Sequence, residues 1–160
     1  MFSIIIPTFN NLEYLKICLS SIKKNSKLTH EIILHVNDGS DGTLKFVKHN
    51  KFKFSHSTNN LGLCTAINIA AKLSTTDYIL YAHDDMYFCP GWEDSLIKEI
   101  NFIKHENFYL SGTMIEPNSG HIKLDCGSDY KNFNEKKLLA EFNNNTFFDH
   151  QGSHFAPHLV

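Results

Sequence analysis

The stretch that decides the fold is residues 78–85, which read Tyr-Ile-Leu-Tyr-Ala-His-Asp-Asp. The first five of these residues form an apolar run bounded by polar residues, which predicts a buried β-strand. Asp84 and Asp85 then follow the carboxyl end of that strand, where ligands bind in open α/β sheets. Adjacent carboxylates repel each other unless a cation or hydrogen-bond donors compensate, so the pair indicates a site for Mg²⁺ or Mn²⁺. The alternative is an acidic loop that caps the helix expected after Pro90.

Length and composition describe an ordinary globular protein. The chain has 160 residues, of which 42% are hydrophobic and 20% charged, so we expect a single domain over residues 1–160. The formal net charge of −2 gives no electrostatic case for nucleic acid or an anionic membrane as the main partner. The four cysteines contain no CxxC pair, and the sequence shows no signal peptide and no apolar run of about 18 residues. We therefore expect a cytoplasmic protein, associated with the cytosolic face of a membrane only peripherally.

Strand and helix patterns alternate along the chain on both sides of residues 78–85. We expect strands at residues 3–7, 31–36, 51–55, 78–82 and 109–115, and helices at residues 12–24, 41–50, 61–73 and 92–104. This order implies an α/β fold, with a mainly parallel sheet and helices on both faces. Irregular stretches follow Pro117, and the chain stops on an apolar run. We therefore expect the domain to be incomplete at its C-terminus.

A second polar loop, Asn-Asp-Gly-Ser-Asp-Gly-Thr at residues 37–43, directly follows the expected strand at residues 31–36. Its glycines permit positive φ angles and allow a ligand to approach the backbone. Asp38 can accept hydrogen bonds from a ribose hydroxyl or a base N–H, whereas Asp41 suits the capping of the following helix. An EF-hand loop would need a preceding helix and a glutamate at its twelfth position, so the open alternative is a plain strand-to-helix turn.

Four pieces of the chain occur in an informative order. They are Pro-Thr-Phe-Asn at residues 7–10, the loop at residues 37–43, Asn-Leu-Gly at residues 60–62 before a helix with Ala66 and Asn68, and His-Asp-Asp-Met at residues 83–86 before Pro90-Gly91-Trp92. The ordered set resembles glycosyltransferase family 2, and its last piece resembles the metal-binding DxD region of that family. The resemblance covers about residues 2–115. It implies a GT-A (Rossmann-like) fold and a nucleotide-diphosphate-sugar donor.

The resemblance also implies residue roles. The donor-binding residues that it implies are Pro7, Thr8, Phe9, Asp38, Gly62 and Asp84. Asp38 would contact the base, with a UDP-sugar favoured, and Asp85 together with Asp84 would ligate the Mg²⁺ or Mn²⁺ that bridges the diphosphate. Members of the family usually invert the anomeric centre, using a carboxylate base that deprotonates the hydroxyl of a saccharide or lipid-linked acceptor. The expected activity is thus that of a glycosyltransferase, for example in polysaccharide biosynthesis.

The sequence departs from the family pattern at three points. His83 stands at the first DxD position, where aspartate or asparagine is usual, and Ile67 stands where many relatives have an arginine. The segment that carries the catalytic base in relatives is absent. We therefore expect the base beyond Val160, and Asp149 is a weak candidate within the chain.

Two alternatives to a sugar transferase are open from the sequence. A nucleotidyltransferase also uses carboxylate-bound metal, but it would carry a glycine-rich and basic loop after the first strand, and residues 7–12 are neither. The other alternative is a non-catalytic module that binds a sugar nucleotide. The sequence names neither the sugar nor the acceptor.

Overall fold

The computed structural model describes residues 1–118 and 122–144. The chain divides into two compact units, Met1–Phe88 and Cys89–Val160. The single domain expected over residues 1–160 is not tested by this division and stays a prediction. Among the described residues, no helix combines the length and the apolar character that crossing a bilayer requires.

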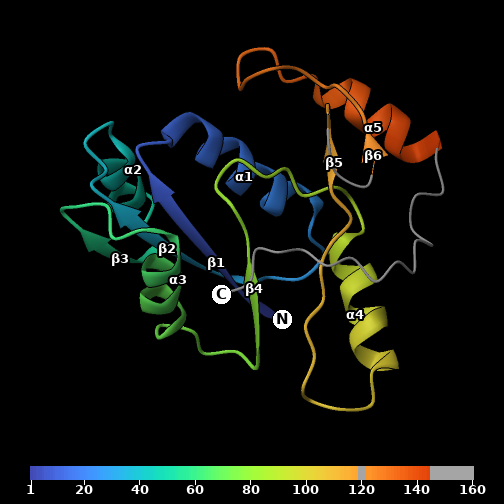
Figure 1. Ribbon diagram of the computed structural model, residues 1–160, viewed down its shortest axis with the longest axis horizontal. Helices are drawn as coiled ribbons and strands as arrows, with labels where there is room; N and C mark the ends of the chain where they lie inside the picture. Colours follow the sequence, from blue (N-terminus) through green and yellow to red (C-terminus); the bar gives the residue numbers. More distant parts are fainter. Residues whose placement is uncertain (119–121, 145–160) are drawn as a thin grey trace. The chain divides into compact units, whose positions relative to one another are not determined.

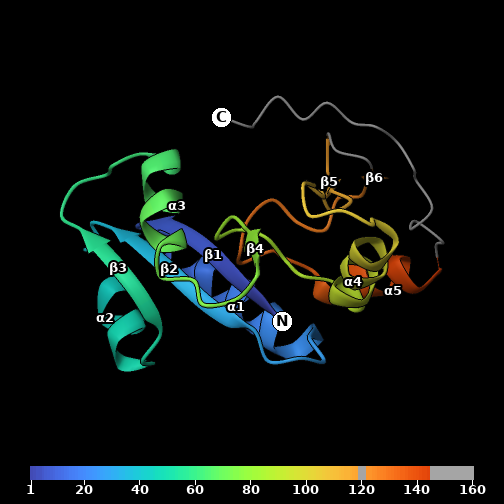
Figure 2. The same ribbon diagram turned by 90° about the horizontal axis from the view of Figure 1, so that it is seen from below.

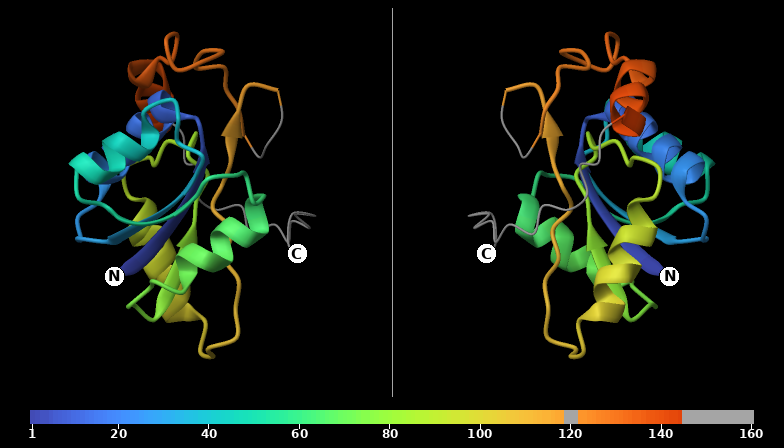
Figure 3. Two further views of the ribbon diagram at one scale, coloured as in Figure 1. Left: turned by 90° about the vertical axis from the view of Figure 1, so that its left-hand side faces the viewer. Right: turned by 90° about the vertical axis from the view of Figure 1, so that its right-hand side faces the viewer.

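The first unit alternates strands and helices. Its elements are β1 (Phe2–Phe9), α1 (Leu12–Asn25), β2 (Glu31–Asn37), α2 (Thr43–His49), β3 (Lys53–Ser57), α3 (Leu63–Ala71) and β4 (Tyr78–Tyr81). The strands form one parallel sheet in the order β3-β2-β1-β4 (Figure 1). α1 and α2 cover one face of this sheet and α3 covers the other (Figures 2 and 3). The expected α/β fold with helices on both faces is therefore confirmed.

The core of this unit is built from the β-branched and aliphatic runs of its two central strands. The side chains that are 0% exposed there are Ile4, Ile5 and Ile6 of β1 and Ile33, Leu34 and Val36 of β2. α3 packs on this sheet through Ala70, which lies against Ile5 and Ile33. Small side chains at this position let the helix approach the strands closely, as the alanine-rich sequence of the helix predicts.

Among the described strands β4 lies at an edge of the sheet, and the expectation of a buried strand at residues 78–82 is wrong in this respect. β4 lies at the end of the sheet order and pairs with β1, and Tyr78 and Ile79 are 40% and 53% exposed. An apolar run indicates a strand, but it does not indicate which strands become its neighbours. Beyond the strand, the N–H of buried Ala82 donates to the Ile5 carbonyl at 3.0 Å. This bond fixes the direction of the loop that follows.

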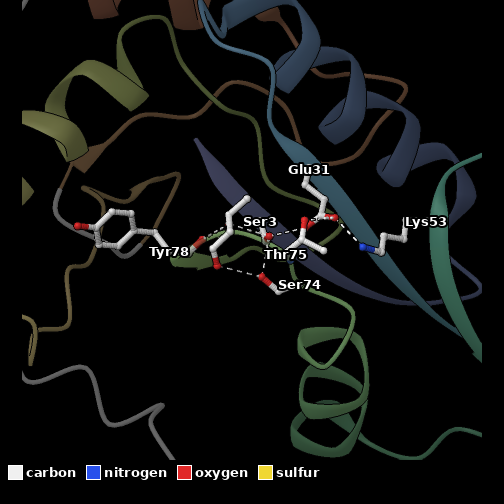
Figure 4. Close-up of polar contacts among 7 residues, drawn as sticks. Ser3, Glu31, Lys53, Ser74, Thr75 and Tyr78 are labelled. Atoms are coloured by element: carbon white, nitrogen blue, oxygen red, sulfur yellow. Dashed lines mark hydrogen bonds and ion pairs between the residues drawn. The ribbon is translucent and has the colours of Figure 1, made fainter.

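A polar network stabilises the edge at which the strands begin (Figure 4). Glu31, at the start of β2, accepts hydrogen bonds from Ser3 Oγ at 2.5 Å and from Lys53 Nζ at 2.6 Å. The backbone N–H of Thr75 donates to the same carboxylate at 2.9 Å, and Ser74 Oγ donates to Ser3 Oγ at 2.7 Å. The donors lower the pKa of Glu31 to about 2, with Lys53 contributing most. The connection between α3 and β4 is thereby joined to β1 and β2.

The second unit contains α4 (Trp92–Phe102), β5 (Ile115–Glu116), β6 (Ile122–Lys123) and α5 (Glu135–Asn144). β5 and β6 pair with each other in a short parallel ladder. The strand expected at residues 109–115 is wrong, because residues 103–114 form neither helix nor strand. The apolar pattern there has no pairing partner among the described residues, and Tyr109 is 64% exposed.

Candidate functional site

The side chain of Asn10 joins the loops that follow β1 and β2. Asn10 has a positive φ of 48°, which turns the chain out of β1. Its Nδ2 donates to Asp38 Oδ2 at 2.8 Å, and its Oδ1 accepts from the backbone N–H of Gly39 at 3.0 Å. Because β1 and β2 are parallel neighbours, their carboxyl ends meet at one edge of the sheet. Asn10 therefore positions Asp38 at that edge.

Asp38 is an anionic group with spare hydrogen-bonding capacity. Ser40 Oγ donates to its Oδ2 at 2.9 Å, and the hydrogen bonds from Asn10 and Ser40 lower the pKa of Asp38. Its backbone N–H donates to the Ser57 carbonyl at 2.8 Å, which anchors it to the end of β3. A carboxylate offers about four acceptor positions. Asp38 can therefore also accept an N–H or O–H from a ligand.

Asp41 joins the first turns of two helices, but the prediction that it caps the following helix is wrong in position, because the N-cap residue of α2 is Gly42. Its Oδ1 accepts from the N–H of Thr43 at 3.0 Å and its Oδ2 from the N–H of Leu12 at 2.9 Å. Burial raises the pKa of Asp41, but these bonds outweigh burial and leave the pKa lowered. The same loop requires glycine at position 39, where φ is +80° and a Cβ would lie 2.7 Å from Val36 Cγ1.

Two buried polar residues of β2, His35 and Asn37, were not among the predicted site residues. Asn37 Oδ1 accepts hydrogen bonds from Ser57 Oγ at 3.0 Å and from the N–H of Leu61 at 2.9 Å. His35 Nε2 lies 3.2 Å from the same serine oxygen, and burial lowers the pKa of His35. These bonds fix the chain just before Gly62, where no atom lies within 4 Å of the position a Cβ would take. The sequence signal that could have identified His35 and Asn37 is the presence of polar residues within the apolar run of a strand.

Asp84 and Asp85 follow β4 at the same edge. Asp84 is half-buried and accepts a hydrogen bond from Asn11 Nδ2 at 3.0 Å. Burial raises the pKa of Asp84, and the charge of Asp85 adds to this, while Thr8 and Asn11 oppose it. The buried Thr8 hydroxyl forms no hydrogen bond of ordinary length among the described residues, but it is near enough to act on Asp84. A half-buried carboxylate such as Asp84, with a second carboxylate beside it, is one that a divalent cation would stabilise.

One side of α1 positions the loop that carries these carboxylates. The contacts are Cys18 Sγ to the His83 carbonyl at 3.6 Å, Ser21 Oγ to the Phe88 N–H at 2.9 Å, and Asn25 Nδ2 to the Phe88 carbonyl at 2.6 Å. Asn11, Cys18, Ser21 and Asn25 are spaced by seven, three and four residues, so they lie along one side of the helix. Burial, together with the nearby Asp84 and Asp85, raises the pKa of Cys18 to about 12. Sequence reasoning missed this polar stripe because Cys18 reads as an ordinary core residue.

The donor set at residues 84 and 85 fits Mg²⁺ or Mn²⁺, which prefer oxygen ligands. Among the residues that the structure describes, no three His, Cys, Asp or Glu side chains come together as a metal site. A cation held by these two carboxylates would keep several coordination positions for other oxygen ligands. His83 Nε2 lies 2.9 Å from the Tyr81 hydroxyl, so this imidazole nitrogen already has a protein partner.

The structure places all the predicted donor-site and metal-site residues at the carboxyl ends of the parallel strands. Pro7, Thr8 and Phe9 end β1, Asp38 follows β2, Gly62 precedes α3, and Asp84 and Asp85 follow β4. Phe9 is 50% exposed, while Ile67 packs on the core of the sheet. Asp149 lies outside the described residues. The roles of these side chains in binding stay predictions.

Comparison with known proteins identifies a family. Residues 3–156 match the model of Glycosyl transferase family 2. An uncharacterized glycosyltransferase of Rickettsia bellii is 29% identical over 117 residues, which cover 69% of this chain and 16% of that protein. The chain therefore spans a small part of this relative's length.

Solved structures share the fold. TarS 1–349 of S. aureus aligns with a TM-score of 0.56 and 27% identity, covering 63% of this chain and 32% of that one. Its complex with UDP aligns with a TM-score of 0.55 and 26% identity. The mannosyltransferase PcManGT from Pyrobaculum calidifontis, in complex with GDP-Man and Mn²⁺, aligns with a TM-score of 0.54 and 18% identity, covering 65% of this chain and 32% of that one. This last likeness is one of fold alone.

Proposed function

The chain belongs to glycosyl transferase family 2, and we propose that it forms the donor-binding part of an inverting, metal-dependent glycosyltransferase of GT-A fold that uses a UDP-sugar. One observation carries the proposal. The anionic Asp38 and the Asp84–Asp85 pair follow β2 and β4, the strands on either side of β1. Such an edge suits a ligand with a base at one end and a diphosphate at the other. The UDP complex of TarS, a structure 26% identical to this chain, supports the choice of nucleotide.

Asp38 and Phe9 are the residues that we assign to the nucleoside. The Asp38 carboxylate, oriented by Asn10, would accept the N3–H of uracil. Phe9 is 50% exposed at the end of β1 and offers a ring to the nucleoside. The open space at Gly62 leaves room for the ribose or the phosphates close to the backbone. These three elements together would read the nucleotide end of the donor.

Asp84 and Asp85 are the residues that we assign to the divalent cation, Mg²⁺ or Mn²⁺. When bound, the cation would stabilise the negative charge that develops on the diphosphate as the bond to the sugar breaks. The 160 residues contain no arginine, the side chain that neutralises phosphate oxygens in a bidentate manner. This composition favours a metal as the main counter-charge. Asn11 would keep Asp84 oriented toward it.

For the transfer step we propose inversion. A carboxylate base removes the proton from an acceptor hydroxyl as its oxygen attacks the anomeric carbon, on the face opposite the departing diphosphate. We expect this base beyond Val160, with Asp149 as the weak candidate within the chain. The acceptor would be a saccharide or a lipid-linked sugar, as in polysaccharide biosynthesis. The four cysteines are all free, which fits a reducing compartment and supports a cytoplasmic location.

Calorimetric titration tests the nucleotide assignment. The protein is titrated with UDP, GDP and dTDP, each with and without Mn²⁺, and we expect UDP to bind most tightly and Mn²⁺ to strengthen its binding. Asp38→Asn should weaken UDP binding at least tenfold, because a hydrogen bond to a charged group contributes about 1.5–3 kcal/mol. Asp77→Asn is the matched control, since this exposed aspartate precedes β4 at the opposite edge. If the folded protein binds none of these nucleoside diphosphates, or if Asp38→Asn binds UDP as tightly as the unaltered chain, the proposal fails.

Turnover separates the remaining alternatives. A chain extended past Val160 is incubated with UDP-sugars, and release of UDP is measured with and without Mn²⁺. Release of pyrophosphate from a nucleoside triphosphate and a sugar phosphate would instead identify a nucleotidyltransferase. Tight UDP-sugar binding with no release under any condition would identify a non-catalytic module.

A further inference from the structure

The net charge of −2 hides a separation of charge within the first unit. Residues 14–30 and 42–76 contain no aspartate or glutamate. The acidic side chains of the unit instead lie mostly at the two edges of the sheet, at the candidate site and at Glu31, where Lys53 neutralises the carboxylate. The lysines are concentrated on the two helices that cover one face. The positively and negatively charged side chains of this unit therefore lie mostly on different parts of its surface.

We define the basic face as Lys16 and Lys23 of α1, Lys45 and Lys48 of α2, and Lys51 in the turn after α2, all of which are exposed. α1 and α2 lie on the same face of the sheet (Figures 2 and 3). The α1 and α2 parts of the basic face adjoin, because Lys16 Nζ lies 5.9 Å from the centre of the Phe46 ring of α2. Asp41 further ties the first turns of the two helices together.

Acidic side chains neutralise little of the positive charge of the basic face. Glu13 is the acid of α1, and its carboxylate lies 2.7 Å from Lys16 Nζ. α2 contains no acidic residue, and α1 and its following turn also contribute Lys24 and Lys27, which interact with other groups. On the opposite face of the sheet, α3 and its C-cap carry Lys72 alone. The positive charge therefore belongs to one side of the unit.

The type of charged side chain on the basic face indicates the kind of partner that it binds. Lysine is a compact, strongly hydrated charge on a long stem, which suits a diffuse layer of negative headgroups. The specific reading of nucleic-acid bases relies mainly on bidentate side chains, above all arginine, and arginine is absent from the chain. We propose that the basic face binds reversibly to a bilayer containing anionic phospholipids. Because α1 starts beside Asp84, this contact would bring the candidate site close to substrates carried in the membrane.

Vesicle sedimentation of the whole chain tests this proposal. Vesicles of about 30% phosphatidylglycerol in phosphatidylcholine are compared with pure phosphatidylcholine, at about 0.1 M and 0.5 M NaCl, because salt shortens the range of surface charge. We expect binding to the anionic vesicles alone, lost at the higher salt concentration. Each lysine near such a surface strengthens binding about fivefold, so the triple variant K23Q/K45Q/K48Q should bind about 100-fold more weakly.

The matched control is K72Q/K98Q/K104Q, which removes the same charge from exposed lysines elsewhere. It should change vesicle binding by less than about twofold if the face rather than the total charge decides. Equal losses in the two variants, or no binding of the unaltered chain at low salt, would overturn the proposal. Tighter binding to a single-stranded RNA than to anionic vesicles would overturn it as well. UDP titration of the same variants keeps this result separate from the proposed function, because none of the replaced lysines is a residue that we assign to the nucleotide or to the cation.

Discussion

Glu31 provides the sharpest test of how this fold is stabilised. Its carboxylate accepts hydrogen bonds from Ser3, Lys53 and Thr75, at the edge opposite the candidate site. These bonds lower the pKa of Glu31 from 4.5 to about 2, with the bond from Lys53 as the largest cause. At about 1.4 kcal/mol per pKa unit, this gives a ceiling of about 3.5 kcal/mol on the contribution of the charge. Because the Lys53 side chain is 38% exposed, solvent screening reduces our expectation to about 1–2 kcal/mol.

Urea unfolding of Glu31→Gln, followed by far-ultraviolet circular dichroism, measures this contribution. Glutamine keeps the shape of the side chain and its acceptor oxygen, so the loss reports mainly on the charge. The matched control is Glu13→Gln, because Glu13 also contacts a lysine, at 2.7 Å, but both side chains of that pair are more than 40% exposed. We expect the control to cost less than about 0.5 kcal/mol at neutral pH.

The pH dependence of the free energy of unfolding provides a second, independent test of the same prediction. The folded-state pKa of Glu31 lies below the unfolded-state value, so its stabilisation is present above pH 4.5 and is lost as the pH falls toward 2. The difference between the unaltered chain and Glu31→Gln should therefore be largest near pH 7 and should shrink over that acidic range. A loss no larger than that of Glu13→Gln, or a gap that stays constant down to about pH 3, would refute this account of the edge.

Two further substitutions address the candidate site. Gly39→Ala should lower the free energy of unfolding by about 2 kcal/mol or more, because φ is +80° and the new Cβ would lie 2.7 Å from Val36 Cγ1; an unchanged urea midpoint would show that the loop relaxes freely. Asn11→Ala should weaken Mn²⁺ binding to the UDP complex about three- to tenfold, because Asp84 loses its 3.0 Å hydrogen bond. Ser20→Ala, on the exposed side of the same helix, should leave the titration unchanged, and equal effects of the two substitutions would count against the role of Asn11.

Much of the first unit could be predicted from the sequence, because short-range patterns decide it. Ile4, Ile5 and Ile6 form a β-branched run that is fully buried in β1, and the order of strands and helices implies parallel pairing. The edge position of β4 could not be predicted, because its pattern of Tyr and Ile residues is also that of a central strand. The strand expected at residues 109–115 failed for a related reason. A strand needs a partner, and a local pattern does not supply one.

The candidate site shows the same division between local and distant information. Asp38 and Asp84 could be located because each follows a strand, and parallel strands bring their carboxyl ends together. Their supports could not be found in this way. Asn37 lies within a strand and bonds the N–H of Leu61, which is 24 residues away, and Asn11 bonds Asp84 across 73 residues. A polar residue within an apolar strand marks Asn37 as unusual, but nothing in the local sequence indicates which distant group the Asn37 or Asn11 side chain bonds.

α1 presents two sides with different chemistry, and this separation makes the two proposals independent. Its inner side binds the loop after β4 through Asn11, Cys18, Ser21 and Asn25. Its outer side exposes Lys16 and Lys23. Asn11→Ala should therefore change Mn²⁺ and UDP binding but leave vesicle binding intact, whereas K23Q/K45Q/K48Q should do the reverse. If each variant altered both measurements, the two sides of α1 would be coupled. The assignment of separate tasks to these two sides would then be wrong.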